Sequence, residues 1–368
     1  MFVVGLGTET NLSEHRNHKT ANTMSIETKS EGQLGATKKS SLGLGENQVE
    51  MQGATQRRVV EPADPSHALP WPETAVKPVR VRWRYAIGIP VIHLLACLAF
   101  VPWFFSWTGV VLSILGLYVF GTLGINIGFH RLLTHRGMVA PKWLEHTLAV
   151  LGVCTMQDTP ACWVAMHRIH HQHSDHQPDP HSPLVTFFWG HFGWLMFDNR
   201  DFTNVKDYQR FTRDLLKDPF YMKLERNTNW LKIYLAVAML FPLVGFLVGW
   251  LMTGNVWGGV QFGSSLLVWG VFVRTVLNWH ITWSVNSVTH IWGYKNYETK
   301  DNSRNNWIIG LLANGEGWHN NHHADQRAAA HGHKWWEFDV SWLTILAFEK
   351  LGLVTDVVRP RIWTEKTE

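Results

Sequence analysis

The chain has 368 residues, of which only 17% are charged, and it carries a formal net charge of +4. Soluble domains average about 25% charged residues, and here two stretches, residues 85–129 and 233–273, contain no Asp, Glu, Lys or Arg at all. This distribution excludes an ordinary soluble enzyme, and so small a net charge gives no reason to expect a nucleic-acid partner.

The first 75 residues are rich in Ser, Thr, Gly, Gln, Glu and Lys. A segment of this composition cannot bury enough apolar surface to offset the entropy that it would lose on ordering. The sequence therefore predicts a disordered tail over residues 1–75 and a membrane domain over residues 76–368. Arg80, Arg82 and Arg84 form a basic collar directly before the first uncharged stretch.

Each uncharged stretch is about twice as long as one membrane-spanning helix, which needs about 20 residues. Each stretch therefore predicts a helical hairpin, and the expected fold class is an all-α integral membrane protein with four spans. The predicted spans are residues 85–105, 107–129, 233–252 and 258–279, the last with room to run on toward His290. Tryptophan residues flank both hairpin turns, as in the aromatic belts of membrane proteins.

The distribution of Lys and Arg predicts the orientation in the membrane. All 33 of them lie in residues 1–84, 131–232 and 274–368, and the two predicted hairpin turns contain none. With four spans, these three segments share one face of the membrane, which the positive-inside rule makes cytoplasmic. We therefore expect a multi-pass membrane protein whose two termini and helical cap are cytoplasmic.

Three histidine clusters fall on that same face, together with a polar pair that ends the fourth span. In chain order they are His130 and His135 (HxxxxH), His167, His170 and His171 (HxxHH), Asn286 and His290, and His319, His322 and His323 (a second HxxHH). Two HxxHH patterns in one chain are improbable as a coincidence, so the pattern indicates metal ligands.

Helix geometry explains the HxxHH spacing, because residues i, i+3 and i+4 share one face and can point three imidazoles into one cavity. The HxxxxH spacing turns its second residue away from the first, so it requires either a distorted helix end or two different metals. Eight or nine imidazoles exceed one coordination sphere, and the clusters therefore predict two metal ions. Imidazole suits iron, copper, nickel and zinc alike, but a polar cluster beside lipid is costly and favours a redox function, hence iron.

Together these motifs resemble the membrane fatty-acid desaturases, and specifically their Δ9, stearoyl-type branch. The resemblance covers about residues 85–357. It is carried by five phrases, which are GFHRL at 128–132, HRIHH at 167–171, DPH at 179–181, NSVTH at 286–290 and GEGWHNNHH at 315–323.

In that family nine histidines hold two iron ions. The resemblance assigns this role to His130, His135, His167, His170, His171, His290, His319, His322 and His323, and it places Asn286 on one iron through a water. The implied reaction is the O2-dependent introduction of a cis double bond, at Δ9, into a saturated long-chain acyl group. The sequence shows no nicotinamide-, flavin- or haem-binding motif, so the electrons would come from a separate ferredoxin, or from cytochrome b5 with its reductase.

Further expectations concern the surroundings of the metals. The resemblance suggests Asp179, His181 and His191 as partners that orient ligands, and Trp283 as part of the acyl tunnel. The other histidines considered are expected to be interfacial or structural, and they are His93, His146, His173, His176, His280, His331 and His333.

The acyl carrier stays open between a CoA thioester and a membrane-lipid ester. Animal acyl-CoA desaturases have an Arg-Asp pair directly before the second histidine box and a basic pair after the DPH phrase, and both help to bind CoA. This chain has Ala165-Met166 and Leu184-Val185 at those places. These four residues carry no charge, so they offer no ion pair to the negatively charged CoA head group.

Two other functions fit parts of the pattern. A non-haem iron hydroxylase acting on lipids, sterols or alkanes shares histidine boxes, and it would give a hydroxylated chain without an alkene. A non-enzymatic membrane metal carrier or sensor would need polar ligands within its spans, where the strongest candidates are His93 and Asn126.

Overall fold

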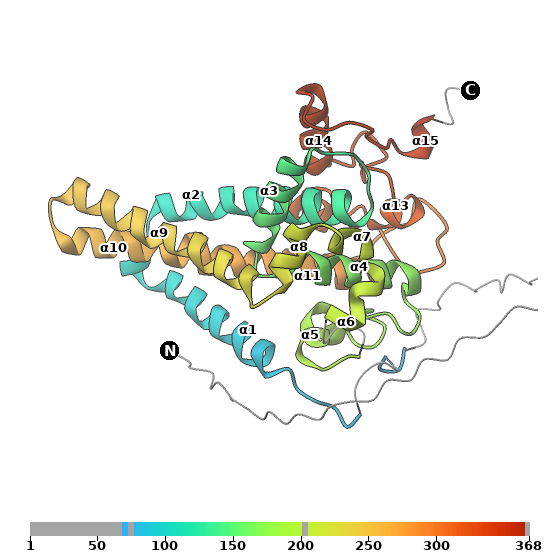
Figure 1. Cartoon of the computed structure of the whole chain (residues 1–368), viewed down its shortest axis with the longest axis horizontal. Helices are drawn as coiled ribbons and strands as arrows, with labels where there is room; N and C mark the ends of the chain where they lie inside the picture. The colour runs from blue at the N-terminus through green and yellow to red at the C-terminus, as the bar shows by residue number, and fades with distance from the viewer. Residues whose placement is uncertain (1–67, 73–76, 201–204, 365–368) are drawn as a thin grey trace, which may run out of the picture. The chain divides into compact units, whose positions relative to one another are not determined.

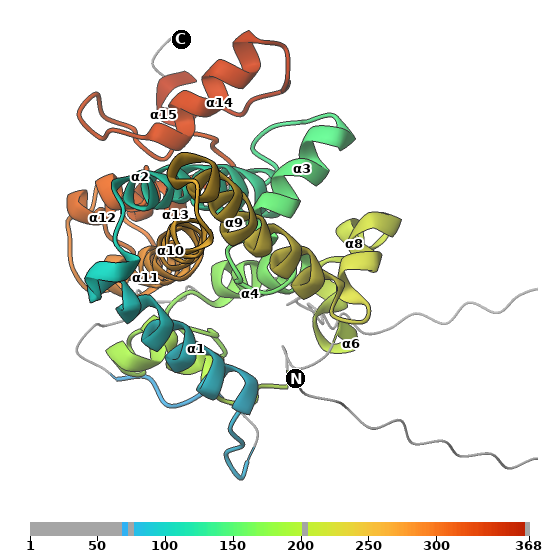
Figure 2. The same cartoon turned by 90° about the vertical axis from the view of Figure 1, so that its left-hand side faces the viewer.

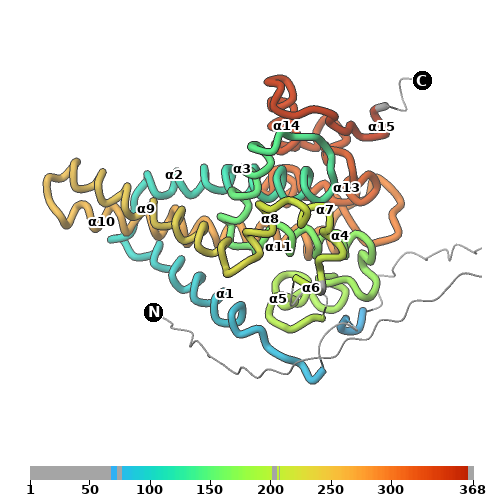
Figure 3. The backbone as a smooth tube through the Cα atoms, in the orientation of Figure 1, coloured from blue at the N-terminus to red at the C-terminus, as the bar shows by residue number. Residues whose placement is uncertain are grey.

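The structure is a computed structural model that describes residues 68–72, 77–200 and 205–364. All regular secondary structure in these residues is helical, apart from isolated β-bridges, which confirms the all-α prediction. Figures 1 and 3 show the helices in chain order from blue to red. The predicted disordered tail lies outside the described residues, except for residues 68–72.

The α-helices are α1 (Trp83–Ala96), α2 (Trp107–Gly116), α3 (Lys142–Val153), α4 (Pro160–His173), α5 (Trp194–Met196), α6 (Val205–Tyr208), α7 (Arg213–Leu216), α8 (Pro219–Glu225), α9 (Asn229–Thr253), α10 (Val256–Leu267), α11 (Arg274–Ser287), α12 (Trp307–Leu312), α13 (His319–Ala324), α14 (Val340–Lys350) and α15 (Arg361–Thr364). The π-helical segments are η3 (Leu117–Thr134), η4 (Trp189–Gly193) and η6 (Val268–Val273), and the 3-10 turns are η1 (Cys97–Phe100), η2 (Pro102–Phe104), η5 (Gln209–Phe211) and η7 (Val288–His290).

Four helices are long and apolar enough to cross a membrane, which is the predicted number. They are Trp83–Phe100 (α1 with η1), Trp107–Thr134 (α2 with η3), Asn229–Thr253 (α9) and Val256–His290 (α10 through η7). The second runs past its predicted end and so carries His130, and the fourth runs on to His290, as the sequence analysis allowed. Each candidate ligand is part of the same continuous helix as an apolar segment. The placement of that segment therefore also places the histidine.

Helices α9 and α10 lie side by side (Figure 1), because glycines let their backbones approach closely. A Cβ atom on Gly249 would lie 2.6 Å from the carbonyl oxygen of Gly258, and one on Gly245 would lie 2.9 Å from the Cα of Gly263. Small residues are the usual means by which membrane helices gain close packing. Helix α1, in contrast, diverges from α2 and packs against η6 and α11 (Figure 2).

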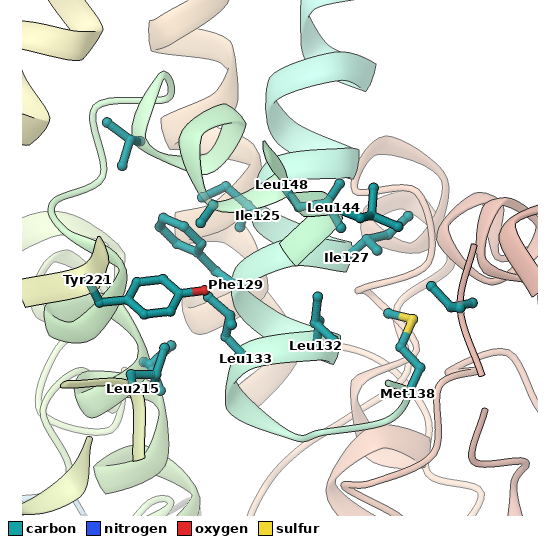
Figure 4. Close-up of a cluster of buried hydrophobic side chains, with 14 of the residues drawn as sticks. Ile125, Ile127, Phe129, Leu132, Leu133, Met138, Leu144, Leu148, Leu215 and Tyr221 are labelled. Carbon is teal, nitrogen blue, oxygen red and sulfur yellow. The ribbon is translucent and has the colours of Figure 1, made fainter. Parts of the chain in front are cut away.

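The largest cluster of buried hydrophobic side chains lies beneath the end of η3 and joins it to α3, α4, α8 and α14. From η3 the cluster includes Phe129 and Leu133, which Figure 4 shows beside Tyr221 of α8. Burial of apolar side chains is the main stabilising contribution here. It anchors the segment of η3 that carries the first histidine box.

Helix α3 is a short helix that lies, along the chain, between the second and the third apolar helices. It begins at Lys142 and packs against η3. The two helices cross where neither has a side chain, since a Cβ atom on Gly124 would lie 2.3 Å from the Gly152 nitrogen. A Cβ atom on Gly152 would in turn meet the ring of Phe129 at 2.5 Å, so this crossing positions Phe129 and the histidine that follows it.

Candidate metal centre and acyl cavity

The first histidine box lies at the π-helical end of η3. The N–H of His135 donates to the carbonyl oxygen of His130, five residues earlier, over 3.1 Å. An i to i+5 hydrogen bond marks π-helical winding, and it brings the two imidazoles together with ring centroids 4.8 Å apart. Of the two explanations open for HxxxxH, the structure therefore has the distorted helix end.

The nine predicted ligands come together in two groups. The first comprises His130, His135, His167, His171 and His322, and the second comprises His170, His290, His319 and His323. Helix α4 and helix α13 each contribute to both groups, so the three imidazoles of one HxxHH box do not all join the same group. In each box the first and third histidines, i and i+4, join one group, and the middle one, i+3, joins the other. Adjacent residues differ by about 100° around a helix, and this angle separates the middle histidine from its neighbour.

Within each group the ring nitrogens converge. The Nε2 atom of His322 lies 3.2 Å from Nε2 of His130 and 2.9 Å from Nε2 of His171. The Nε2 atom of His171 in turn lies 3.0 Å from Nε2 of His167. In the second group Nε2 of His323 lies 3.1 Å from that of His319. Neutral imidazoles have one donor and one acceptor nitrogen each, so nitrogens that face one another in this number require a shared cation or additional protons.

Four of the nine histidines place Nδ1 against a buried carboxylate. The pairs are His130 with Glu316 (2.5 Å), His170 with Asp179 (3.0 Å), His290 with Asp175 (2.8 Å) and His323 with Asp301 (2.6 Å). Donation from Nδ1–H to a carboxylate leaves the lone pair on Nε2, as in metal-binding histidines generally. Sequence reasoning singled out only Asp179. It missed the other three because their histidine partners lie 22 to 186 residues away in the chain.

The donor set fits two metal ions. The Nε2 atoms of His135, His170 and His290 are buried and have no hydrogen-bond partner. An unsatisfied buried polar atom costs about 1–3 kcal/mol, and a cation bound by these lone pairs would remove that cost. Nine imidazoles in groups of five and four form two adjacent all-nitrogen sites, a donor set that iron accepts.

Burial favours the neutral, metal-binding form of three candidate ligands that lie outside the apolar helices. Together with the neighbouring imidazoles, it lowers the pKa of His167, His171 and His322 well below the usual value of 6.5. Metal coordination requires the neutral imidazole. Burial by itself would raise the pKa of Asp301, but the His323 imidazole outweighs it and holds this pKa well below its usual range.

A buried arginine links the first group to the C-terminal cap. Arg131 donates to Glu316 over 2.9 and 3.0 Å and to both oxygens of Asp339 over 3.0 Å. One guanidinium between two carboxylates leaves a net negative charge, which complements a cation held by His130. His331, expected to be interfacial or structural, is also buried here, with its ring 4.4 Å from that of His322.

An apolar cavity adjoins the first group through His167. Its lining includes Ile89 of α1 and Trp279 and Trp283 of α11, with His167 and Asn286 on the same surface. A smaller neighbouring cavity is lined by Asn286 together with His130, His167 and His319. The structure thus places Trp283 in the cavity wall, and Asn286 beside histidines from both groups.

Two further predicted residues have different surroundings. His181 lies 4.4 Å from the ring of His170 and shares Asp179 with it as a possible metal-binding group. His191 hydrogen bonds to Ser287 over 2.9 Å and to His280 over 3.0 Å, and its ring packs against Trp283. The structure therefore brings Asp179 and His181 to the metal region and places His191 behind the tryptophan wall of the cavity.

Arg168 connects the first two histidine boxes to helix α7, and its ion pair with Asp214 leads to a prediction about stability in acid. Arg168 of α4 donates to the carbonyl oxygens of Leu133 (2.9 Å) and Phe211 (2.7 Å) and to Asp214 (2.9 Å). Burial would raise the pKa of Asp214, but hydrogen bonds from Arg168 and Arg136 outweigh it and lower the pKa to about 2. The unfolded value is about 3.9, so the pair stabilises the fold above about pH 4, and this contribution is lost as the pH falls toward 2.

We therefore expect Asp214→Asn to lower the unfolding temperature at neutral pH and to flatten its fall between about pH 4 and pH 2. Thermal unfolding of the detergent-solubilised protein, followed by tryptophan fluorescence across this pH range, measures both effects. Identical pH profiles for the variant and the parent protein would show that the ion pair does not stabilise the fold.

Residues 102–339, which contain all nine histidines, match the family model for fatty acid desaturases. The chain belongs to this family. Desaturases are oxidoreductases, and the chemistry of this one is the introduction of a double bond into an acyl chain. The two groups of histidines beside an apolar cavity agree with a metal centre for that reaction.

Curated relatives of this desaturase match most of the chain. It is 42% identical to the sn-1 stearoyl-lipid 9-desaturase of Anabaena variabilis, over 77% of this chain and 96% of the relative. It is 38% identical to the sn-2 palmitoyl-lipid 9-desaturase of Nostoc sp. (strain 36), over 78% and 93%. It is also 38% identical to the acyl-CoA 5-desaturase AL21 of Anemone leveillei, over 83% and 91%.

Proposed function

We propose that this desaturase introduces a cis double bond at position 9 of saturated long-chain acyl groups that are esterified to membrane lipids, using a pair of iron ions. The single observation that carries the proposal is the convergence of nine histidines, from four separate segments, in two groups beside an apolar cavity. Similarity to lipid 9-desaturases supports the position and the carrier.

The residues that would hold the irons are the two groups of histidines, with Asn286 reaching one iron through a water. When bound, a pair of irons supplies the reduction of O2 and the oxidation of unactivated C–H bonds. The reaction takes two electrons and two protons from adjacent methylenes and two electrons from a donor, with two protons from solvent, and O2 leaves as two water molecules.

The task of the chain is to place one pair of methylenes beside the metals and to keep water away. The cavity wall is largely apolar, and Trp279 and Trp283 are both only 4% exposed. An aliphatic chain bound there is stabilised by about 25 cal/mol per Å² of apolar surface removed from water. The carboxylates on Nδ1 of four histidines keep their imidazoles oriented toward the metals.

The residues around the second histidine box support a lipid ester rather than a CoA thioester. Ala165 and Met166 are buried, so neither their chemistry nor their position offers a charged contact to a polyanionic head group. Val185 is buried as well. Because the chain also resembles an acyl-CoA desaturase from Anemone leveillei, the test below includes acyl-CoA as a substrate.

We also propose that the four apolar helices cross the membrane as two hairpins, with both termini and the metal centre in the cytoplasm. The absence of Lys and Arg from both hairpin turns supports this orientation. The electrons would come from a separate ferredoxin or cytochrome b5, since no motif for a built-in donor is seen in the sequence.

Expression in a desaturase-deficient host, followed by mass-spectrometric mapping of double bonds, tests the proposed function. We expect a new Δ9 alkene in the membrane-lipid fraction and none that appears first in the acyl-CoA fraction after pulse labelling. A hydroxylated chain without an alkene would identify the protein as a hydroxylase instead. An alkene that appears first on CoA would contradict the lipid carrier but not the desaturation.

A further inference from the structure

The metal region has two sides, and the histidines divide between them. His167 of the first group and His319 of the second line the inner cavities together with Asn286. On the other side, two surface pockets reach the metal region. One is lined by His135 and His171 of the first group, and the other by His323 of the second. Each group of ligands therefore has members toward the acyl cavity and members toward the surface.

The two surface pockets share a rim. Gln326 and Arg327, in the loop after α13, line both of them, and both residues are exposed. His135 and His171 are half-buried, unlike His170, His290 and His319, which are at most 1% exposed. The rim is thus the place where imidazoles from both groups come closest to solvent.

The surroundings of the rim are positively charged. Arg168 lines the first pocket and Arg361 the second. Arg168 and Arg136 form ion pairs with Asp214, and Arg361 forms one with Asp325. Among the residues that line the two pockets, Arg168, Arg327 and Arg361 are positive and Asp325 is negative, which gives a net charge of +2.

We propose that the rim around Gln326 and Arg327 is the docking surface for an acidic one-electron carrier protein, which passes electrons to the metals through His135, His171 and His323. The proposal rests on the proposed function, because an O2-dependent desaturase needs two electrons from outside. Electron transfer slows steeply with distance, so a donor must approach where ligands reach the surface. Complementary charge accelerates such encounters, which bury small interfaces.

The test measures the reduction of the oxidised, iron-loaded protein in lipid nanodiscs by stopped-flow spectroscopy. Reduced [2Fe–2S] ferredoxin and reduced cytochrome b5 are used in separate arms, at low and high ionic strength. We expect Arg327→Glu to lower the second-order rate constant for one or both carriers by about tenfold at low salt, and by much less at high salt. Arg327→Lys should retain most of the rate. Lys350→Glu, a charge reversal at an exposed residue that lines neither pocket, should leave it unchanged.

A second measurement separates docking from catalysis. The same variants are reduced photochemically without a protein donor and then mixed with O2, and the double bond formed in a single turnover is quantified. We expect Arg327→Glu to match the parent protein here. Equal rates of reduction of Arg327→Glu and the parent by both carriers would overturn the docking surface. If the reduced parent protein forms no alkene, the proposed function is contradicted. The rates of reduction by the two carriers would still show whether the rim is the docking surface.

Discussion

Replacement of His322 by alanine is expected to abolish desaturation and to remove about half of the bound iron. His322 is fully buried in the first group, and its Nε2 atom lies within 3.2 Å of the ring nitrogens of His130 and His171. Removing one donor from a group of five histidines breaks the coordination of that ion. The second group does not contain His322, so its metal should remain. Product is measured by gas chromatography–mass spectrometry, and iron by inductively coupled plasma mass spectrometry.

His146→Ala is the matched control for this experiment. His146 lies on α3, hydrogen bonds to Asp218 over 2.9 Å and stacks on Phe220. It belongs to neither histidine group, and its own cluster with Glu145 and Asp218 is separate from both and only half-buried. We expect this variant to keep its iron and its activity. We expect His167→Ala and His323→Ala to lose activity as His322→Ala does. Turnover retained by His322→Ala with a full complement of iron would refute the assignment of the first group.

Replacement of Asp175 by asparagine is expected to weaken metal binding or turnover by about 10- to 100-fold, the usual cost of losing a carboxylate behind a ligand histidine. Asp175 is fully buried, accepts from Nδ1 of His290 over 2.8 Å and also accepts from Ser182 and the backbone of Asn302. Asparagine keeps the shape but removes the charge that fixes the tautomer of His290. Titration of the metal-free protein with Fe(II), together with the steady-state rate, measures the loss.

The backbone makes Asp356→Asn a suitable control. Asp175 and Asp356 both have a positive φ, of 59° and 50°, and asparagine tolerates this conformation as aspartate does. Asp356 is exposed, and its carboxylate accepts a hydrogen bond from the neighbouring Thr355. The control should therefore behave as the parent protein. An Asp175→Asn variant with unchanged iron affinity and rate would show that the carboxylate does not act through His290.

Much of the metal region could be predicted because the relevant patterns are short. The HxxHH spacing fits within one turn of helix, and the structure brings all six of these histidines, with His130, His135 and His290, into two groups. The division between the groups could not be predicted, since it depends on how α4 and α13 face each other. The angle between the adjacent histidines of one box is set by the helix itself. The histidines of other segments that each of them meets are set by the packing of the helices.

The carboxylates behind the histidines show the same limit. Asp179 could be proposed because it lies nine residues after His170 and belongs to a recognisable phrase. Asp175 and Asp301 lie in no such phrase, and their contacts with His290 and His323 depend on the packing of the cap. His331 was likewise expected to be interfacial or structural, and only the fold places it beside His322 and Glu316.

By itself, the sequence determined that the protein is helical, that four helices are long and apolar enough to span a membrane, and which histidines would gather. The helices and their number follow from uncharged length and from the helical period, which act over one or a few turns. The set of histidines follows from their spacing together with the resemblance to the desaturases. The tertiary structure alone decided the partition into five and four, the π-helical end that unites His130 with His135, and the two-sided arrangement of the metal region. The partition depends on contacts between segments up to 192 residues apart, and chain packing rather than local periodicity selects such contacts. The hydrogen bond from His135 to His130 is local, but the HxxxxH spacing by itself fits two separate metals equally well.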